Sequence, residues 1–173
     1  MPPETDNLEL EELFQHDQED RQKVFDTPKA LEYLQERDQT RRKRVYAMIE
    51  LGEVQTKNDL YHAGIILHHS DRPEDHLVSH RFAALAAVMG HKTARWLMAA
   101  ALDRTLMSLG RPQIYGTQFE YNASNHQYEL KLPLQDSLML SFEKKFLGIP
   151  SIQERLEELN RHLGEKKVTQ GDV

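Results

Sequence analysis

Apolar residues return every three or four positions along most of the chain, the spacing that one face of an α-helix requires. A first helix is expected after the capping pair Thr5-Asp6, and its apolar positions are Leu8, Leu10, Leu13 and Phe14. Thr27-Pro28 is a cap followed by proline, which favours a helix start. From there the pattern reaches Gly52, either as one helix or as two helices that meet near Asp38.

Three more helices are predicted in the middle of the chain. Thr56-Lys-Asn-Asp59 resembles a capping box and opens a helix that ends at about His69. Pro73 opens the next helix, which ends at Gly90, and the third covers residues 92–110. Short connections between successive helices favour antiparallel neighbours, so we expect a bundle or a short helical repeat.

After residue 110 the pattern changes from helical to alternating. Residues 117–121 and 127–132 flank a polar turn at 122–126, which predicts a β-hairpin at about 117–132, and Pro133 ends its second strand. A short helix is expected at 142–147 and an amphipathic helix after Ser151, which opens a second capping box. The predicted fold is therefore mainly α: a compact antiparallel helical bundle with a small β-hairpin after the central helices. We expect one domain over residues 1–165 and a disordered tail at 166–173.

Composition narrows the classes of protein to which the chain can belong. Hydrophobic residues make up 39% and charged residues 29%, as in globular chains. No apolar run approaches the roughly 18 residues of a membrane span, and the first residues lack the features of a secretory signal. The absence of cysteine excludes disulfides, thiolate metal sites and cysteine nucleophiles. We therefore expect a cytoplasmic protein.

The net charge of −6 argues against non-specific binding to nucleic acid, which relies on clustered positive charge. The one basic run, at residues 41–44, lies among acidic residues, and we expect it to form a solvated helix face. Neither nucleic acid nor a membrane is expected as a partner. The sequence leaves the oligomeric state open.

Residues 59–118 carry most of the candidate chemistry, because six of the nine histidines fall there among alanine-rich runs. Burying titratable groups among alanine and leucine costs stability unless each group is paired. The block is therefore either a closed hydrogen-bond network or a working site.

Asp103 shares one helical face with Trp96, Ala100 and Met107, so its carboxylate is expected to point inward. A buried carboxylate either has a raised pKa or is held ionised by donors. Two readings stay open: a structural Asp that fixes helix packing, or a catalytic or ligand-binding Asp. Arg111 or a histidine is the expected partner, since the neighbouring Arg104 faces another way.

The histidines divide by their helical phase. His69 ends its helix and is a candidate for function, whereas a helix-end role is expected for His68 and a solvated position for His76. His80 shares a face with alanines and is expected to be interior. The spacing of His76 and His80 is compatible with a metal, with His69, Asp71 or Asp103 as a third ligand. The spacing alone is weak, and no metal or other cofactor is expected.

The loop after Gly110 is rich in hydrogen-bonding groups. Arg111, Gln113, Tyr115, Thr117 and Gln118 can bind a carboxylate, amide or phosphate, and glycine allows a close backbone approach. The alternative is that these groups satisfy the backbone where helix gives way to hairpin.

These motifs together resemble a bacterial family of domains of unknown function, whose pattern reads roughly QHG…AH…A…G…A.WL.A…DR.L…G.PQ.YGTQ. The matching strings are Ile-Ile-Leu-His-His at 65–69, Ser-His at 79–80, Ala-Arg-Trp-Leu at 94–97, Asp-Arg at 103–104, and Gly-Arg-Pro-Gln…Tyr-Gly-Thr-Gln at 110–118. An upstream Asp-Gln…Arg element of the family resembles either residues 17–21 or residues 38–42, and the Leu-Gly-Ile-Pro at 147–150 is similar to its ending.

The resemblance covers about residues 17–163 and implies a family but no reaction. The family positions fall on His69, His80, Asp103, Arg104, Gln113, Gly116, Thr117 and Gln118. One departure is His68, which stands where the family has Gln.

Two hypotheses follow. In the first, the protein is an enzyme for a small anionic or amide-bearing ligand, with His69, His80 and Asp103 as a general acid–base site in a helical cup. Its binding residues are Arg104, Arg111, Gln113, Tyr115, Thr117 and Gln118. In the second, the same polar cluster is a structural network, and the protein is an interaction module. A metal-dependent enzyme or a small-ligand sensor is a third, weaker reading.

Overall fold

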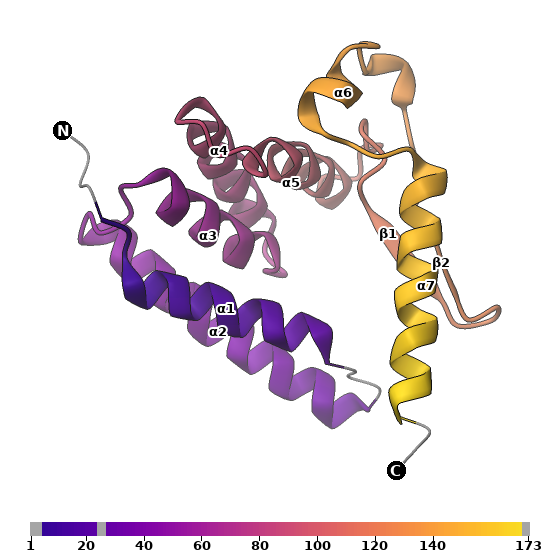
Figure 1. Ribbon diagram of the computed structural model, residues 1–173, viewed down its shortest axis with the longest axis horizontal. Helices are drawn as coiled ribbons and strands as arrows, with labels where there is room; N and C mark the ends of the chain where they lie inside the picture. Colours follow the sequence, from indigo (N-terminus) through magenta and orange to yellow (C-terminus); the bar gives the residue numbers. More distant parts are fainter. Residues whose placement is uncertain (1–4, 24–26, 171–173) are drawn as a thin grey trace.

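The computed structural model describes residues 5–23 and 27–170, with side chains described up to residue 164. Two long helices, α1 (Leu8–Gln22) and α2 (Pro28–Glu50), form an antiparallel pair at the N-terminal side (Figure 1). Three shorter helices follow, α3 (Lys57–His68), α4 (Pro73–Val88) and α5 (Ala94–Ser108). The predicted mainly α fold is confirmed, and α2 runs through Asp38 as one helix.

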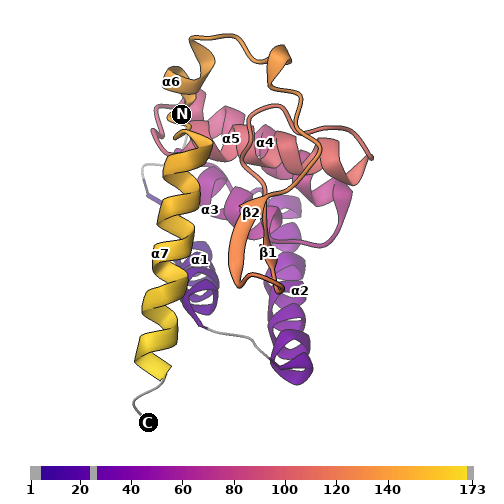
Figure 2. The same cartoon turned by 90° about the vertical axis from the view of Figure 1, so that its right-hand side faces the viewer.

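The second part of the chain is smaller and mixed. Strands β1 (Phe119–Asn122) and β2 (Gln127–Leu130) form the antiparallel hairpin, with Phe119 opposite Leu130. A 3-10 turn η1 (Asp136–Leu138) and the short α6 (Glu143–Leu147) lead to α7 (Ile152–Gln170). Helix α7 lies along the hairpin (Figure 2). Asn160 joins them, because its amide oxygen accepts a hydrogen bond from the Tyr128 amide at 2.7 Å.

The helices begin where side chains satisfy the free amide groups of a first turn. Thr56 and Asp59 form the predicted capping box of α3, and Thr27 accepts a hydrogen bond from the Ala30 amide. Helix α1 differs from the prediction, because Asn7, rather than Thr5 or Asp6, is its cap.

Helix α3 is the centre of the bundle. One core cluster joins it to α1 and α2, and its members are Leu10, Val45, Met48, Ala63, Ile66 and Leu67. On the other side, Gly64 lets α3 approach α4 and α5 closely: an added Cβ would lie 3.1 Å from the Leu97 side chain. The hydroxyl of Ser79 also donates to the Gly64 carbonyl at 2.7 Å. These contacts fix the end of α3, where the histidines lie.

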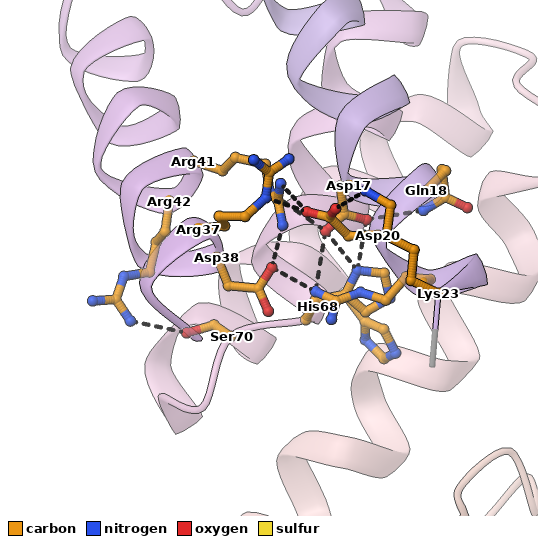
Figure 3. Close-up of polar contacts among 12 residues, drawn as sticks. Asp17, Gln18, Asp20, Lys23, Arg37, Asp38, Arg41, Arg42, His68 and Ser70 are labelled. Carbon is orange, nitrogen blue, oxygen red and sulfur yellow. Dashed lines mark hydrogen bonds and ion pairs between the residues drawn. The ribbon is translucent and has the colours of Figure 1, made fainter. Parts of the chain in front are cut away.

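Helices α1 and α2 are joined by buried and partly buried charges, which we call the charged seam: Asp17, Asp20, Arg21, Arg37, Asp38 and Arg41. Figure 3 shows Asp17, Asp20, Arg37, Asp38 and Arg41 of this seam. Arg41 is only 4% exposed and donates to Asp20 at 2.8 Å and to Asp38 at 2.5 Å. The prediction of a solvated basic face is therefore wrong for Arg41. Its helical phase turns it towards the carboxylates of α1, which the run of charges alone did not indicate.

None of the described helices is long and apolar enough to cross a membrane. Helix α7 is described as far as Gln170, and the remaining residues of the predicted tail, 171–173, lie outside the described residues.

Candidate functional site

Asp103 is fully buried and holds the loop that follows α5. One carboxylate oxygen accepts hydrogen bonds from the amides of Ile114 and Tyr115, at 2.7 and 3.0 Å. The other accepts from the amide and hydroxyl of Thr117, at 3.1 and 2.8 Å. Backbone amides and a hydroxyl therefore take up both oxygens, which is the structural alternative considered for this residue. Its carboxylate is turned to the loop and not to the histidines.

The same loop is held from within by Gln113, which is completely buried. Its side-chain oxygen accepts from the Gln118 amide at 2.9 Å, and its nitrogen donates to the Gln118 and Lys131 carbonyls. Gly116 has a φ of 70°, which favours glycine. Asp103 and Gln113 thus give the loop one conformation, and that conformation presents Thr117 and Gln118 to a cavity.

This cavity, which we call the central basin, has a volume of about 590 Å³ and lies between α1, α3, α5, the hairpin and α7. Its polar lining includes Gln18, Arg21, His68, His69, Arg104 and Gln118. Aromatic side chains, among them Tyr61, Trp96 and Tyr128, supply apolar contact area. No aspartate or glutamate is among the described residues that line the basin, although the chain has a net charge of −6.

Arg104 differs from the other charged side chains of the basin in its hydrogen-bond partners. Its Nε donates to the Gln118 side-chain oxygen at 3.0 Å and its Nη1 to the His68 carbonyl at 2.5 Å. Burial lowers the pKa of Arg104 to about 10, and the positive charge of Arg21 contributes. Within the described part of the chain, no carboxylate forms an ion pair with Arg104, and no hydrogen bond is made by its Nη2.

The other arginines of the basin differ in this respect. Arg21 pairs with Asp17 at 3.2 Å and with Asp38 at 2.7 Å. Arg155 pairs with Glu158 on α7 at 2.5 Å. Among the described residues, Arg104 is therefore the basin arginine that has no carboxylate partner.

His69 is paired with Asp17. The Nδ1 of His69 lies 2.8 Å from the Asp17 carboxylate, whose side chain is 1% exposed. Burial raises the pKa of Asp17, but the hydrogen bond and charge of His69, together with Arg21 and Arg41, outweigh it and hold that pKa below its usual value. The carboxylate is therefore ionised and accepts the Nδ1 proton, which leaves Nε2 of His69 as the nitrogen available to a ligand in the basin.

His68 and His76 are both buried, each 5% exposed, so the prediction of a solvated His76 is wrong. His68 is the last residue of α3, the helix end expected for it. The tight turn between α3 and α4 folds the start of α4 back over the end of α3, and the two rings lie 6.5 Å apart. Burial lowers the pKa of His68 well below its usual value, and the charge of Arg104 lowers it further. Its Nδ1 has no hydrogen-bond partner among the described residues.

His80 does not join the site. It is partly buried rather than interior, and its Nδ1 donates to the Met98 carbonyl at 2.9 Å. The Nε2 of His76 donates to the Ser70 carbonyl, so the two histidines of the proposed metal pair bond to different carbonyls. Among the described residues no group of three or more histidine or acidic side chains is arranged to hold a metal ion.

The predicted binding residues divide among three places. Arg104, Thr117 and Gln118 line the basin. Tyr115 packs beside the apolar cluster of Ala99, Leu147 and Ile149, and burial raises its pKa. Arg111 lines a second cavity, described below.

Sequence reasoning missed Asp17, Gln18, Arg21 and His68 as site residues. Two signals pointed to α1: the four-residue spacing of Asp17 and Arg21, which places them on one face, and the Asp-Gln…Arg element of the family resemblance. Neither signal indicated that this face meets the end of α3, because that contact depends on packing across 52 residues of sequence.

Compared with models of known protein families, with curated proteins and with solved structures, the chain matches none.

Proposed function

We propose that this protein is an enzyme that binds a small anionic substrate in the central basin and moves a proton on it. In this proposal Arg104 binds the anionic group, and His69 acts as the general acid–base, oriented by Asp17. Gln18, Thr117 and Gln118 complete the polar lining.

The observation that carries the proposal is the uncompensated charge of Arg104. A partly buried cation costs free energy when no carboxylate offsets it, so a structural network would be expected to supply one. In the charged seam the protein does supply carboxylates, to Arg37 and Arg41. A bound anion would offset the charge of Arg104, and its Nη2 offers donors to the anion.

The pairing of His69 with Asp17 supports catalysis over binding alone. A carboxylate that accepts the Nδ1 proton fixes the tautomer and orientation of the ring, so that Nε2 can take up and return a proton. An oriented histidine in a cavity that also binds an anion can catalyse a proton transfer, as in isomerisation, cyclisation, elimination or hydrolysis. Asp103 and His80 take no part in this proton transfer. Asp103 instead holds the loop that follows α5.

A defined mixture of small carboxylic acids and phosphate esters, incubated with the purified protein and followed by mass spectrometry, tests the proposal. The wild-type protein should consume at least one component. His69→Gln should still bind that component but not consume it, because glutamine cannot exchange the proton.

Arg104→Gln should weaken binding of the consumed component at least tenfold, because it removes the charged donor and charge-assisted hydrogen bonds contribute about 1.5–3 kcal/mol. Arg81→Gln is the matched control, since Arg81 is exposed and lines neither the basin nor the second cavity. Consumption that continues unchanged in His69→Gln would contradict the assigned role of His69.

The alternative is an interaction module in which the polar cluster is structural. Exposed apolar side chains between the hairpin and α7 favour it, namely Leu138, Leu140, Phe142 and Phe146. In that case Arg104→Gln should change the free energy of unfolding, and the affinity of the protein for each small anion should be the same as in the wild type.

A further inference from the structure

A second cavity, which we call the outer cavity, lies beyond the Arg104–Gln118 pair. It has a volume of about 510 Å³ and lies between the end of α5, the start of α4 and the segment after β2. Arg104, Gln118 and Phe119 line both cavities and separate them. As in the basin, no aspartate or glutamate is among the described residues that line it.

Two exposed cations lie at the outer cavity, Arg111 on the loop and Lys131 just after β2. Neither forms an ion pair with a carboxylate in the described ranges 5–23 and 27–164. Together with Arg104 they give this cavity three positive side chains and no negative one. A cavity of that charge attracts an anion.

His76 adds a more specific feature. The residue is 5% exposed, and its Nε2 donates to the Ser70 carbonyl at 2.8 Å. The proton on Nε2 leaves a lone pair on Nδ1 in the neutral ring. Nδ1 is buried and has no hydrogen-bond partner among the described residues. A buried polar atom in this condition costs free energy unless a ligand or water satisfies it.

The surroundings of His76 keep its ring neutral. Burial lowers the pKa of His76, and Arg104 of α5 lowers it further, whereas the bond to Ser70 and the charges of Asp75 and Asp71 raise it less. His68 of α3 is the other titratable ring beside it. Nδ1 therefore acts as an acceptor, and the ligand of this cavity needs a donor as well as negative oxygens.

We propose that the outer cavity is a site for inorganic phosphate, in which Arg111 and Lys131 bind the anionic oxygens and Nδ1 of His76 accepts a hydrogen bond from the remaining O–H. At neutral pH, hydrogen phosphate carries negative oxygens and one O–H on the same phosphorus atom. Sulfate and carboxylates carry no O–H at this pH. A phosphate monoester has a second pKa of about 6 and has mostly lost its O–H at pH 7.5. This site does not depend on the acid–base role of His69.

Calorimetric titration of the full-length protein with inorganic phosphate and with sulfate at pH 7.5 tests the proposal. Phosphate should bind at least tenfold more tightly than sulfate at the outer cavity. The side-chain NMR signals of His76 identify that cavity, and those of His69 identify the basin. Phosphate should shift the His76 signals.

Arg111→Gln combined with Lys131→Gln should weaken the phosphate affinity reported by His76 at least tenfold, as expected for the loss of two charge-assisted contacts. Arg81→Gln combined with Lys57→Gln changes the net charge equally at exposed positions outside both cavities, and should leave that affinity unchanged. Both exchanges concern exposed side chains, so the fold is expected to persist.

His76→Gln keeps a donor for the Ser70 carbonyl but lacks the second ring nitrogen, so it should remove the preference for phosphate over sulfate. Three results would overturn the proposal: equal affinity for phosphate and sulfate, unchanged phosphate affinity in the double variant, or unshifted His76 signals. Unchanged turnover in His69→Gln would contradict the proposed function but would leave these three measurements as they are, so the two proposals fail separately.

Discussion

The charged seam and the central basin both contain arginines on helices, but the two regions differ in the partners of these arginines. In the seam, Asp20 accepts hydrogen bonds from both Arg37 and Arg41, at 2.6 and 2.8 Å. Burial raises the pKa of Asp20, yet these donors and Lys23 more than offset it and hold that pKa below its usual value. In the basin, the hydrogen-bond partners of Arg104 among the described residues are neutral oxygens only.

In our proposal, this difference separates the structural role of the seam arginines from the ligand-binding role of Arg104. A buried cation that is matched by carboxylates within the chain joins two helices and has little capacity left for a ligand. A cation with neutral partners gains from an anion that arrives from solvent. Arg21 and Asp17 lie where the two regions meet: both belong to the seam, and Asp17 also orients His69. The seam thus positions His69, the residue proposed as the general acid–base of the basin.

The largest expected effect is a loss of stability in Arg41→Met. It leaves the buried Asp20 and the partly buried Asp38 with fewer donors, so the free energy of unfolding should fall by about 3 kcal/mol. Urea denaturation followed by circular dichroism measures it. Arg104→Gln, which removes an unmatched cation and keeps a donor, should lose less than about 1 kcal/mol. Equal losses in the two variants would mean that the matched and unmatched arginines do not differ in role.

Asp103→Asn should have the next largest effect. The carboxylate of Asp103 has two acceptor oxygens, whereas the asparagine side chain has one oxygen and one NH2 group. Either the amide and hydroxyl of Thr117 or the amides of residues 114 and 115 would therefore face an N–H donor instead of an acceptor. We expect a loss of about 2 kcal/mol. Hydrogen exchange at the Tyr115 and Thr117 amides should become faster. Unchanged exchange at both amides would contradict the role of Asp103 in holding the loop.

Most of the fold could be predicted from the sequence, because its signals are local. The Thr27 cap with Pro28, the capping boxes at Thr56 and Ser151, and the alternation around the hairpin each depend on residues within a few positions. Periodicity also predicted correctly that Asp103 is buried. Whether the helix breaks near Asp38 could not be predicted, since charged residues on a helix surface do not indicate whether the helical backbone continues.

The candidate site was predictable only in part. His69, Thr117 and Gln118 were identified from helix phase and loop composition, and Arg104 from the family resemblance; all four line the basin. The partner of His69 was not, because Asp17 is 52 residues away and the contact exists only once α1 packs on α3. The burial of His76 depends in the same way on the turn that folds α4 over α3. Helix phase gives the direction of a side chain within its own helix, but not which other helix covers it.

The smallest expected effect is a change in pH dependence through His68, at the edge of the basin. Burial depresses the pKa of His68 in the folded protein, whereas the unfolded chain binds a proton near pH 6.5. The unfolded state therefore binds more protons below that pH, so stability should fall as the pH falls through about 6.5. For one histidine, the expected loss between pH 7 and pH 5.5 is about 1 kcal/mol. His68→Gln should remove this part of the slope in urea denaturation at the two pH values. His126→Gln, at an exposed turn of the hairpin, should leave the slope as in the wild type. A slope that is the same in both variants would show that His68 is not held neutral, and would place a second positive charge beside Arg104 in the basin.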